Sequence, residues 1–203
     1  GYFDGFWITR EKTVTENDYS NEGLAVRGIA RTSQTLNYYP DKNNGNSLTL
    51  IEANVRTVTA IDERYSLILS ENIDHYMATE TILFPGGNLD QLVLEGYRTV
   101  DYSYVNPLTD QEDPFRLSTG WAGITTNTQF IFRDGNGDGV ADLYFKDKVV
   151  TETYEYWPEG TSKISKSTRY IGSDPTTATP NSYTFNLNIT MGINGPIQSR
   201  SYE

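Results

Sequence analysis

The segment from Tyr183 to Met191 constrains the fold most, because its apolar and polar residues alternate at every position. A period of two places successive side chains on opposite faces of a strand, so we expect one face of this segment to be buried and the other to be solvated. Fifteen tyrosines and eight phenylalanines, with abundant threonine and valine, favour strands elsewhere as well. No segment follows helical periodicity. The sequence therefore predicts an all-β protein.

Other strand-like runs are spread along the whole chain. They occupy residues 2 to 15, 24 to 39, 48 to 60, 64 to 70, 75 to 84, 92 to 104, 121 to 133, 142 to 157 and 163 to 171. Tight connections such as 71 to 74 and 85 to 88 indicate a meander of antiparallel strands, while residues 106 to 120 are either a plain connection or a mobile lid. We expect a single domain over residues 1–203, with about nine or ten strands in an antiparallel β-barrel; a β-sandwich is the alternative.

Residues 134 to 142 read DGNGDGVAD and place oxygen ligands at alternate positions around a glycine-kinked turn. The predicted ligands are the side chains of Asp134, Asn136, Asp138 and Asp142 and the backbone carbonyl of Val140. Hard oxygen ligands at this spacing are typical of a structural Ca²⁺ site. An ordinary hairpin turn is the alternative, since Asp, Asn and Gly also tolerate left-handed backbone angles.

The flanks of this loop distinguish it from an EF-hand. An EF-hand has a helix on each side and Glu at the twelfth position, whereas the twelfth residue here is Phe145 and both flanks are strand-like. We therefore expect the ion to clamp a connection between two strands. The loop resembles those of FG-GAP and VCBS repeats and, more loosely, those of thrombospondin type 3 repeats and dockerins. FG-GAP propellers and dockerins repeat the loop, but this chain has one copy, so their architectures and partners are not carried over.

A second resemblance rests on short elements at several places in the chain. Gly5-Phe6-Trp7 resembles the G-x-W element of lipocalins, and Thr99-Val100-Asp101-Tyr102 is similar to their T-D-Y element with one residue inserted. The third lipocalin element packs an Arg over that Trp, a role open to Arg169 or Arg200. The lipocalin C-terminal helix has no counterpart here. The resemblance implies a barrel whose cavity holds a small apolar molecule.

Composition limits the partners and the compartment. The net charge of −11, from 16 basic and 27 acidic residues, disfavours nucleic acid and anionic membranes. No apolar run reaches the roughly 20 residues of a membrane-spanning helix, so we expect no membrane insertion. The absence of cysteine excludes disulfides and thiol catalysis. Because such calcium loops suit millimolar extracellular Ca²⁺, we expect a secreted, periplasmic or cell-surface protein of undetermined oligomeric state.

Catalytic signals are sparse. His75 is the only histidine, so a zinc site with two histidines is excluded, and a structural role is the expected one. The sequence lacks a nucleophile elbow, a phosphate-binding loop and a dinucleotide fingerprint. Acid and base chemistry by two carboxylates stays open. The candidates within strand-like runs are Glu80, Glu95, Asp101, Glu152 and Glu155.

Aromatic residues supply the candidate ligand contacts, although plain core packing is the alternative. The candidates are Tyr97, Tyr102, Tyr104, Tyr154, Tyr156 and Trp157. Alternation places Tyr102 and Tyr104 on the face of Leu92, which favours a core or a cavity. Three functions follow as hypotheses. The first is a calcium-stabilised barrel that binds a small apolar or aromatic ligand. The second is a calcium-dependent carbohydrate-binding sandwich, recognisable by an exposed aromatic row. The third is an isomerase, cyclase or polysaccharide-acting enzyme, recognisable by buried paired carboxylates.

Overall fold

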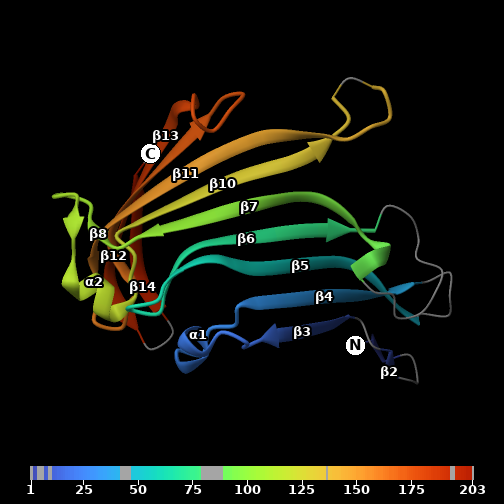
Figure 1. Ribbon diagram of the computed structural model, residues 1–203, viewed down its shortest axis with the longest axis horizontal. Coiled ribbons are helices and arrows are strands. Elements are labelled where there is room, and N and C mark those ends of the chain that lie inside the picture. The colour runs from blue at the N-terminus through green and yellow to red at the C-terminus, as the bar shows by residue number, and fades with distance from the viewer. Residues whose placement is uncertain are drawn as a thin grey trace. The chain divides into compact units, whose positions relative to one another are not determined.

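Ten strands form one sheet in the computed structural model, which describes residues 2–3, 7–8, 11–41, 47–78, 89–135, 137–192 and 195–202 (Figure 1). The first five are β3 (Lys12–Asp18), β4 (Thr32–Asp41), β5 (Ser47–Asp62), β6 (Leu67–Met77) and β7 (Val93–Ser103). The others are β10 (Ile124–Arg133), β11 (Asp142–Tyr156), β12 (Ser162–Ile171), β13 (Thr179–Gly192) and β14 (Gly195–Tyr202).

The sheet is a meander, as predicted. Its strands pair in the order β14-β13-β12-β11-β10-β7-β6-β5-β4-β3. Each strand therefore lies beside the strands of this sheet that come before and after it in the chain. The all-β antiparallel class is confirmed. Within the described residues the pairing order is open, with β3 and β14 at its ends, and no closed barrel is seen. The remaining strands, β1 (Tyr2–Phe3), β2 (Trp7–Ile8), β8 (Val105–Asn106) and β9 (Gln111–Glu112), form two short hairpins.

One predicted turn lies inside a strand. Residues 71 to 74 were expected to connect two strands because of their polar composition, but β6 runs through them without a break. Glu71 is only 5% exposed, and its carboxylate accepts a hydrogen bond of 2.9 Å from the hydroxyl of Tyr102. A buried carboxylate with a hydrogen-bond donor is compatible with a strand, and the sequence does not show that partner.

Two short helices and a short 3-10 helix, η2 (Leu89–Gln91), also differ from the predictions. Helix α1 (Glu22–Val26) overlaps the start of residues 24 to 39, where loose alternation predicts a strand. Its N-cap is Asn21, whose side chain accepts the backbone N–H of Leu24, and Leu24 is 1% exposed. Helix α2 (Pro114–Thr119) and the β8–β9 hairpin occupy most of the predicted long loop. No helix in the described part of the chain is long and apolar enough to cross a membrane.

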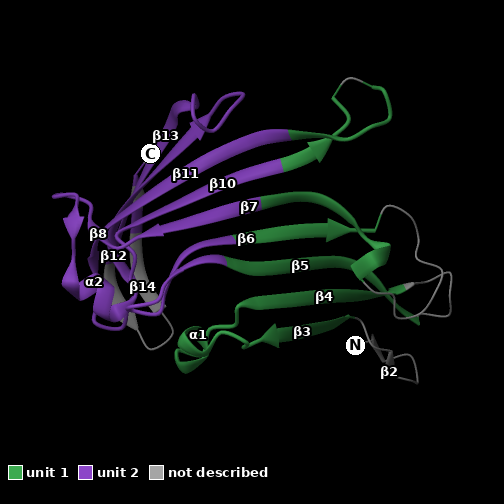
Figure 2. Cartoon of the chain, in the orientation of Figure 1, with its two compact units in different colours: residues 1–58, 72–97, 131–143 green, residues 59–71, 98–130, 144–203 purple. Residues whose placement is uncertain are grey.

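The chain divides into two compact units that are interleaved in sequence (Figure 2). Unit 1 comprises residues 1–58, 72–97 and 131–143, and unit 2 comprises residues 59–71, 98–130 and 144–203. Unit 1 has a core of buried apolar side chains from β4, β5 and the turn before β7. They are Leu36, Leu50, Ala53 and Leu92, with Val14, Tyr38, Tyr76, Ala78 and Leu89 packed against them.

Unit 2 contains a polar and aromatic cluster around α2. The helix has Asp113 as its N-cap, Pro114 in the first turn and Gly120 in the left-handed conformation at its end. These are the residue types preferred at those three positions. Arg116 is 4% exposed and donates hydrogen bonds to the carboxylate of Asp113 and to the Thr153 carbonyl. This cluster fixes α2 to β11.

Candidate metal centre and aromatic face

The predicted calcium loop connects neighbouring antiparallel strands, as expected. Strand β10 ends at Arg133 and β11 begins at Asp142, and the two strands are adjacent in the sheet (Figure 1). The residues between them are exposed wherever they are described, and Asn136 lies outside the described residues. The loop is therefore a solvent-facing connection at the end of a hairpin.

The carboxylate of Asp134 organises this loop. Its Oδ1 accepts the N–H of Gly137 at 2.6 Å, and its Oδ2 accepts the N–H of Gly139 at 2.9 Å. Both glycines have positive φ, +79° and +83°, which side chains rarely adopt. Gly139 is the sixth residue counted from Asp134, the position at which EF-hand loops also turn sharply on a glycine. The backbone therefore curls around the first predicted ligand.

The predicted ligand atoms in this loop are oxygens, the type that Ca²⁺ prefers. An ionised carboxylate has about four lone-pair sites, so Asp134 keeps acceptor capacity beyond its two hydrogen bonds. Asp138 accepts the N–H of Val140 at 2.8 Å with one oxygen. Among the described residues, no three His, Cys, Asp or Glu side chains are gathered as a metal site. Two of the predicted ligands, the Asn136 amide and the Val140 carbonyl, are of other kinds, so closure of the set around an ion stays a prediction.

The predicted aromatic ligand contacts are distributed over both compact units. Tyr97 lies in unit 1 and the other five lie in unit 2. Tyr104 is 8% exposed and its hydroxyl donates to the Ile68 carbonyl, while the Tyr102 hydroxyl donates to Glu71. The Tyr156 hydroxyl donates to the Ala122 carbonyl. Each of these three hydroxyls therefore has a hydrogen-bond partner within the protein, and a role in ligand binding stays a prediction.

The other two aromatic candidates have charged neighbours. The ammonium group of Lys163 lies 5.3 Å from the centre of the Trp157 ring. The hydroxyl of Tyr154 donates to Glu152 Oε2 at 3.2 Å. Burial raises the pKa of Tyr154, and the charge of Glu152 raises it further. The hydroxyl of Tyr154 is therefore held protonated as a hydrogen-bond donor.

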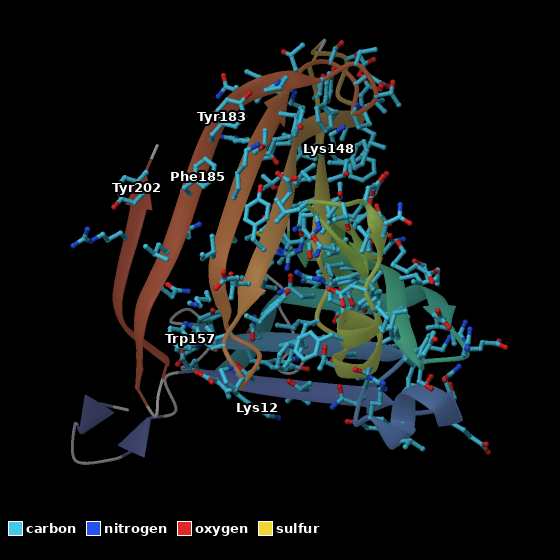
Figure 3. The ribbon with its side chains drawn as sticks, turned by 90° about the vertical axis from the view of Figure 1, so that its left-hand side faces the viewer. Lys12, Lys148, Trp157, Tyr183, Phe185 and Tyr202 are labelled. Carbon is cyan, nitrogen blue, oxygen red and sulfur yellow. The ribbon has the colours of Figure 1, made fainter. Side chains whose placement is uncertain are left out.

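An exposed aromatic group on β13 and β14 was not singled out by the sequence. The register places Glu152, Lys166, Phe185 and Tyr202 opposite one another across β11, β12, β13 and β14. Tyr183 precedes Phe185 by two residues and so shares its face. Figure 3 shows Tyr183 and Phe185 on one strand and Tyr202 on the next. We call these five residues the aromatic face.

The rings of the aromatic face are largely solvated. Tyr183, Phe185 and Tyr202 are 48%, 46% and 54% exposed. The expectation that the apolar face of this strand is buried is therefore wrong at Tyr183 and Phe185. Alternation identifies which residues share a face, but burial also requires a second layer, which the strand's own sequence does not encode. Lys166 and Glu152 form an ion pair of 3.6 Å, and the Lys166 ammonium lies 5.3 Å from the Tyr183 ring centre.

His75 lies within a polar group in unit 1. Its Nδ1 is 3.1 Å from Asn54 Oδ1 and 3.8 Å from Glu52 Oε1, and its Nε2 is 4.0 Å from Glu95 Oε2. This hydrogen-bonded setting agrees with the structural role expected for it. On the neighbouring residue, burial raises the pKa of the Asp74 carboxyl.

The other candidate carboxylates have basic or hydroxyl partners. Asp101 accepts the Ser70 hydroxyl at 2.7 Å, and Glu155 pairs with Lys163 at 2.7 Å. Glu80 lies outside the described residues. These contacts are typical of strand surfaces, and the third hypothesis stays a prediction.

The lipocalin elements fall partly outside the described residues. Gly5 and Phe6 are not described, and Trp7 is described only as a backbone partner of Phe3. Arg169 pairs with Asp147 at 2.7 Å. Comparison with protein-family models, with curated proteins and with solved structures finds no match. The calcium-loop and lipocalin resemblances therefore rest on their own residues.

Proposed function

We propose that this chain is a secreted, periplasmic or cell-surface β domain stabilised by one Ca²⁺ in loop 134–142. The observation that supports it is the pair of hydrogen bonds from Gly137 and Gly139 to Asp134, which curl the backbone around the first ligand position. Oxygen coordination of Ca²⁺ would further require the carboxylates of Asp134, Asp138 and Asp142 to converge on a common centre. The ion would join the ends of β10 and β11 and so oppose separation of the hairpin.

The expected stabilisation follows from mass action. Extracellular calcium modules bind with Kd of about 10⁻⁴–10⁻³ M. At about 5 mM Ca²⁺ such a site contributes about 1–2 kcal/mol to the free energy of unfolding. For a chain of this size that corresponds to a rise of about 2–8 °C in melting temperature.

The proposed ligand is less closely defined than the metal. From the lipocalin resemblance we propose a closed barrel that holds a small apolar or aromatic molecule in its cavity. An antiparallel meander is consistent with such a barrel. The second candidate, a carbohydrate-binding module, is favoured by one specific observation. Three large aromatic side chains at neighbouring positions are about half exposed, as a sugar-stacking surface requires.

Thermal unfolding tests the calcium proposal. The melting temperature of the wild-type chain is measured in EDTA, in CaCl₂ and in MgCl₂, and the same is done for Asp138→Ala. We expect Ca²⁺ to raise the melting temperature of the wild type, and Asp138→Ala to lose that rise. Asp90→Asn is the matched control, because it removes an exposed acidic charge of the same unit outside the loop. If Asp138→Ala keeps the full response, the loop is not the site.

A further inference from the structure

We propose that the aromatic face binds a neutral glycan, with Tyr183, Phe185 and Tyr202 as the stacking platform. This inference deepens the carbohydrate-binding candidate above and does not depend on the bound Ca²⁺. It assigns a site to residues on β13 and β14, whereas the sequence indicated aromatic residues elsewhere. All five residues of the face lie in unit 2.

The register gives the platform its size. Phe185 and Tyr202 are directly opposite on paired strands, where Cβ atoms lie about 4.5–5.5 Å apart. Tyr183 is two residues from Phe185, about 7 Å along the strand. The three rings thus occupy neighbouring corners of one sheet surface (Figure 3). A ligand with more than one ring is needed to cover all of them.

The exposure of these rings favours a ligand with an apolar face. About half of each side chain is in contact with water, so covering the platform would remove apolar surface from water at each ring. The face of an aromatic ring is electron-rich and attracts partly positive hydrogens. A pyranose ring presents several C–H groups on one side and hydroxyl groups around its rim. As a ligand, a pyranose ring therefore matches a flat aromatic ring better than an aliphatic side chain of similar area does.

The polar end of the face supplies the remaining contacts. Lys166 lies opposite Phe185, and Glu152 lies opposite Lys166, so a donor and an acceptor continue the line of the platform. The Tyr154 hydroxyl adds to the polar groups at Glu152, and Arg200 lies on the same face of β14 two residues before Tyr202. Such groups fix the orientation of a ligand through its hydroxyls.

Charge selects a neutral glycan over an anionic one. Glu152 and Lys166 form an ion pair, so their charges cancel on the face itself. The whole chain carries a net charge of −11, which repels polyanions at long range. A sulfated or uronic-acid polymer would require a cluster of unpaired basic groups. The five residues that define the face carry one ion pair beside three rings, and Arg200 lies next to them on β14.

Calorimetric titration of oligosaccharides tests this inference. The probes are the neutral hexasaccharides of cellulose, xylan, mannan and laminarin, with a heparin hexasaccharide as the anionic comparison. We expect at least one neutral probe to bind, and Phe185→Ala and Tyr202→Ala each to raise its Kd about tenfold or more, equivalent to about 1.4 kcal/mol. Tyr19→Ala is the control, because Tyr19 is 49% exposed and lies in unit 1. It should leave the Kd unchanged.

Two further comparisons make the result specific. Phe185→Leu keeps much of the apolar area but removes the flat ring, so it should weaken binding nearly as much as Phe185→Ala. EDTA should leave the Kd for the glycan unchanged, which separates this test from that of the calcium loop. The inference is overturned if no neutral probe binds, if heparin binds preferentially, or if Phe185→Leu binds like the wild type. Equal melting temperatures establish that the variants are folded.

Discussion

Replacing Gly139 by alanine would test the calcium loop with a single methyl group. Gly139 has a φ of +83°, and no heavy atom lies within 4 Å of the position that a Cβ would occupy. A steric clash is therefore excluded, and the cost is that of a left-handed backbone angle in an L-residue, about 1–2 kcal/mol. The residue must keep that angle for its N–H to reach Asp134. The strain is thus inseparable from the loop geometry.

This strain should weaken calcium binding by Gly139→Ala more than it lowers the free energy of unfolding of the metal-free protein. The loop is exposed, so in the metal-free protein it can relax at little cost to the packed sheet. Binding then has to restore the strained angle, and a loss of about 1–2 kcal/mol raises the Kd about 5- to 30-fold. Calorimetric titration with CaCl₂ measures that Kd for the wild type and for Gly139→Ala.

Gly28→Ala is the matched control for this experiment. Gly28 has a φ of +72° and also has no heavy atom within 4 Å of a Cβ, but it follows α1 and lies outside the loop. It should carry the same backbone strain and leave the calcium Kd unchanged. If Gly139→Ala binds Ca²⁺ as tightly as the wild type, the ion is not held by this backbone conformation. Equal weakening by Gly28→Ala would show a general effect of stability.

Three further predictions concern stability, each measured by urea unfolding. Gly160→Ala should lose about 2–4 kcal/mol, because φ is +90° and the new methyl would lie 2.8 Å from the Trp121 ring; an unchanged midpoint would contradict that contact. Arg116→Ala should lose about 3 kcal/mol or more, whereas the exposed Arg169→Ala should lose less than about 1 kcal/mol, and equal losses would refute the difference in burial. Burial raises the pKa of Asp74. The protonated carboxyl therefore stabilises the folded state at pH values below the usual pKa of 3.8, and this contribution is lost as the pH rises through the raised pKa. Asp74→Asn should therefore gain stability relative to the wild type as pH rises from about 3 to 7, and a pH-independent difference would exclude this cause.

The strand order follows from local sequence, which explains why most of it was predictable. Alternation and tight turns identify the strands, and a meander requires only that neighbours in sequence pair. The wrong prediction of a turn at residues 71 to 74 has a tertiary cause, because the Tyr102 hydroxyl that donates to Glu71 is 31 residues away in the sequence. Helix α1 depends on the Asn21 cap and on burial of Leu24, which a five-residue segment shows only weakly.

The two candidate sites differ in how far the sequence reveals them. Loop 134–142 is recognisable because its ligand types and spacing are local, and the hydrogen bonds of Asp134 are also local. The aromatic face is not local. Glu152 and Tyr202 are joined only by the registers of three strand pairs, and neither their alignment nor the exposure of Phe185 can be read from the chain. The strand register must be known before Phe185 and Tyr202 can be recognised as an exposed aromatic pair.

The most direct test of the calcium assignment is the number of Ca²⁺ ions bound per chain, measured by calorimetric titration of the wild type and of Asp134→Asn. Asparagine has the shape of aspartate, but its amide NH₂ replaces one acceptor and would face the N–H of Gly137 or Gly139. One ion per wild-type chain is expected, with binding lost or greatly weakened in Asp134→Asn. A wild-type chain that takes up no Ca²⁺, or an Asp134→Asn variant with unchanged affinity, would contradict the assignment of loop 134–142.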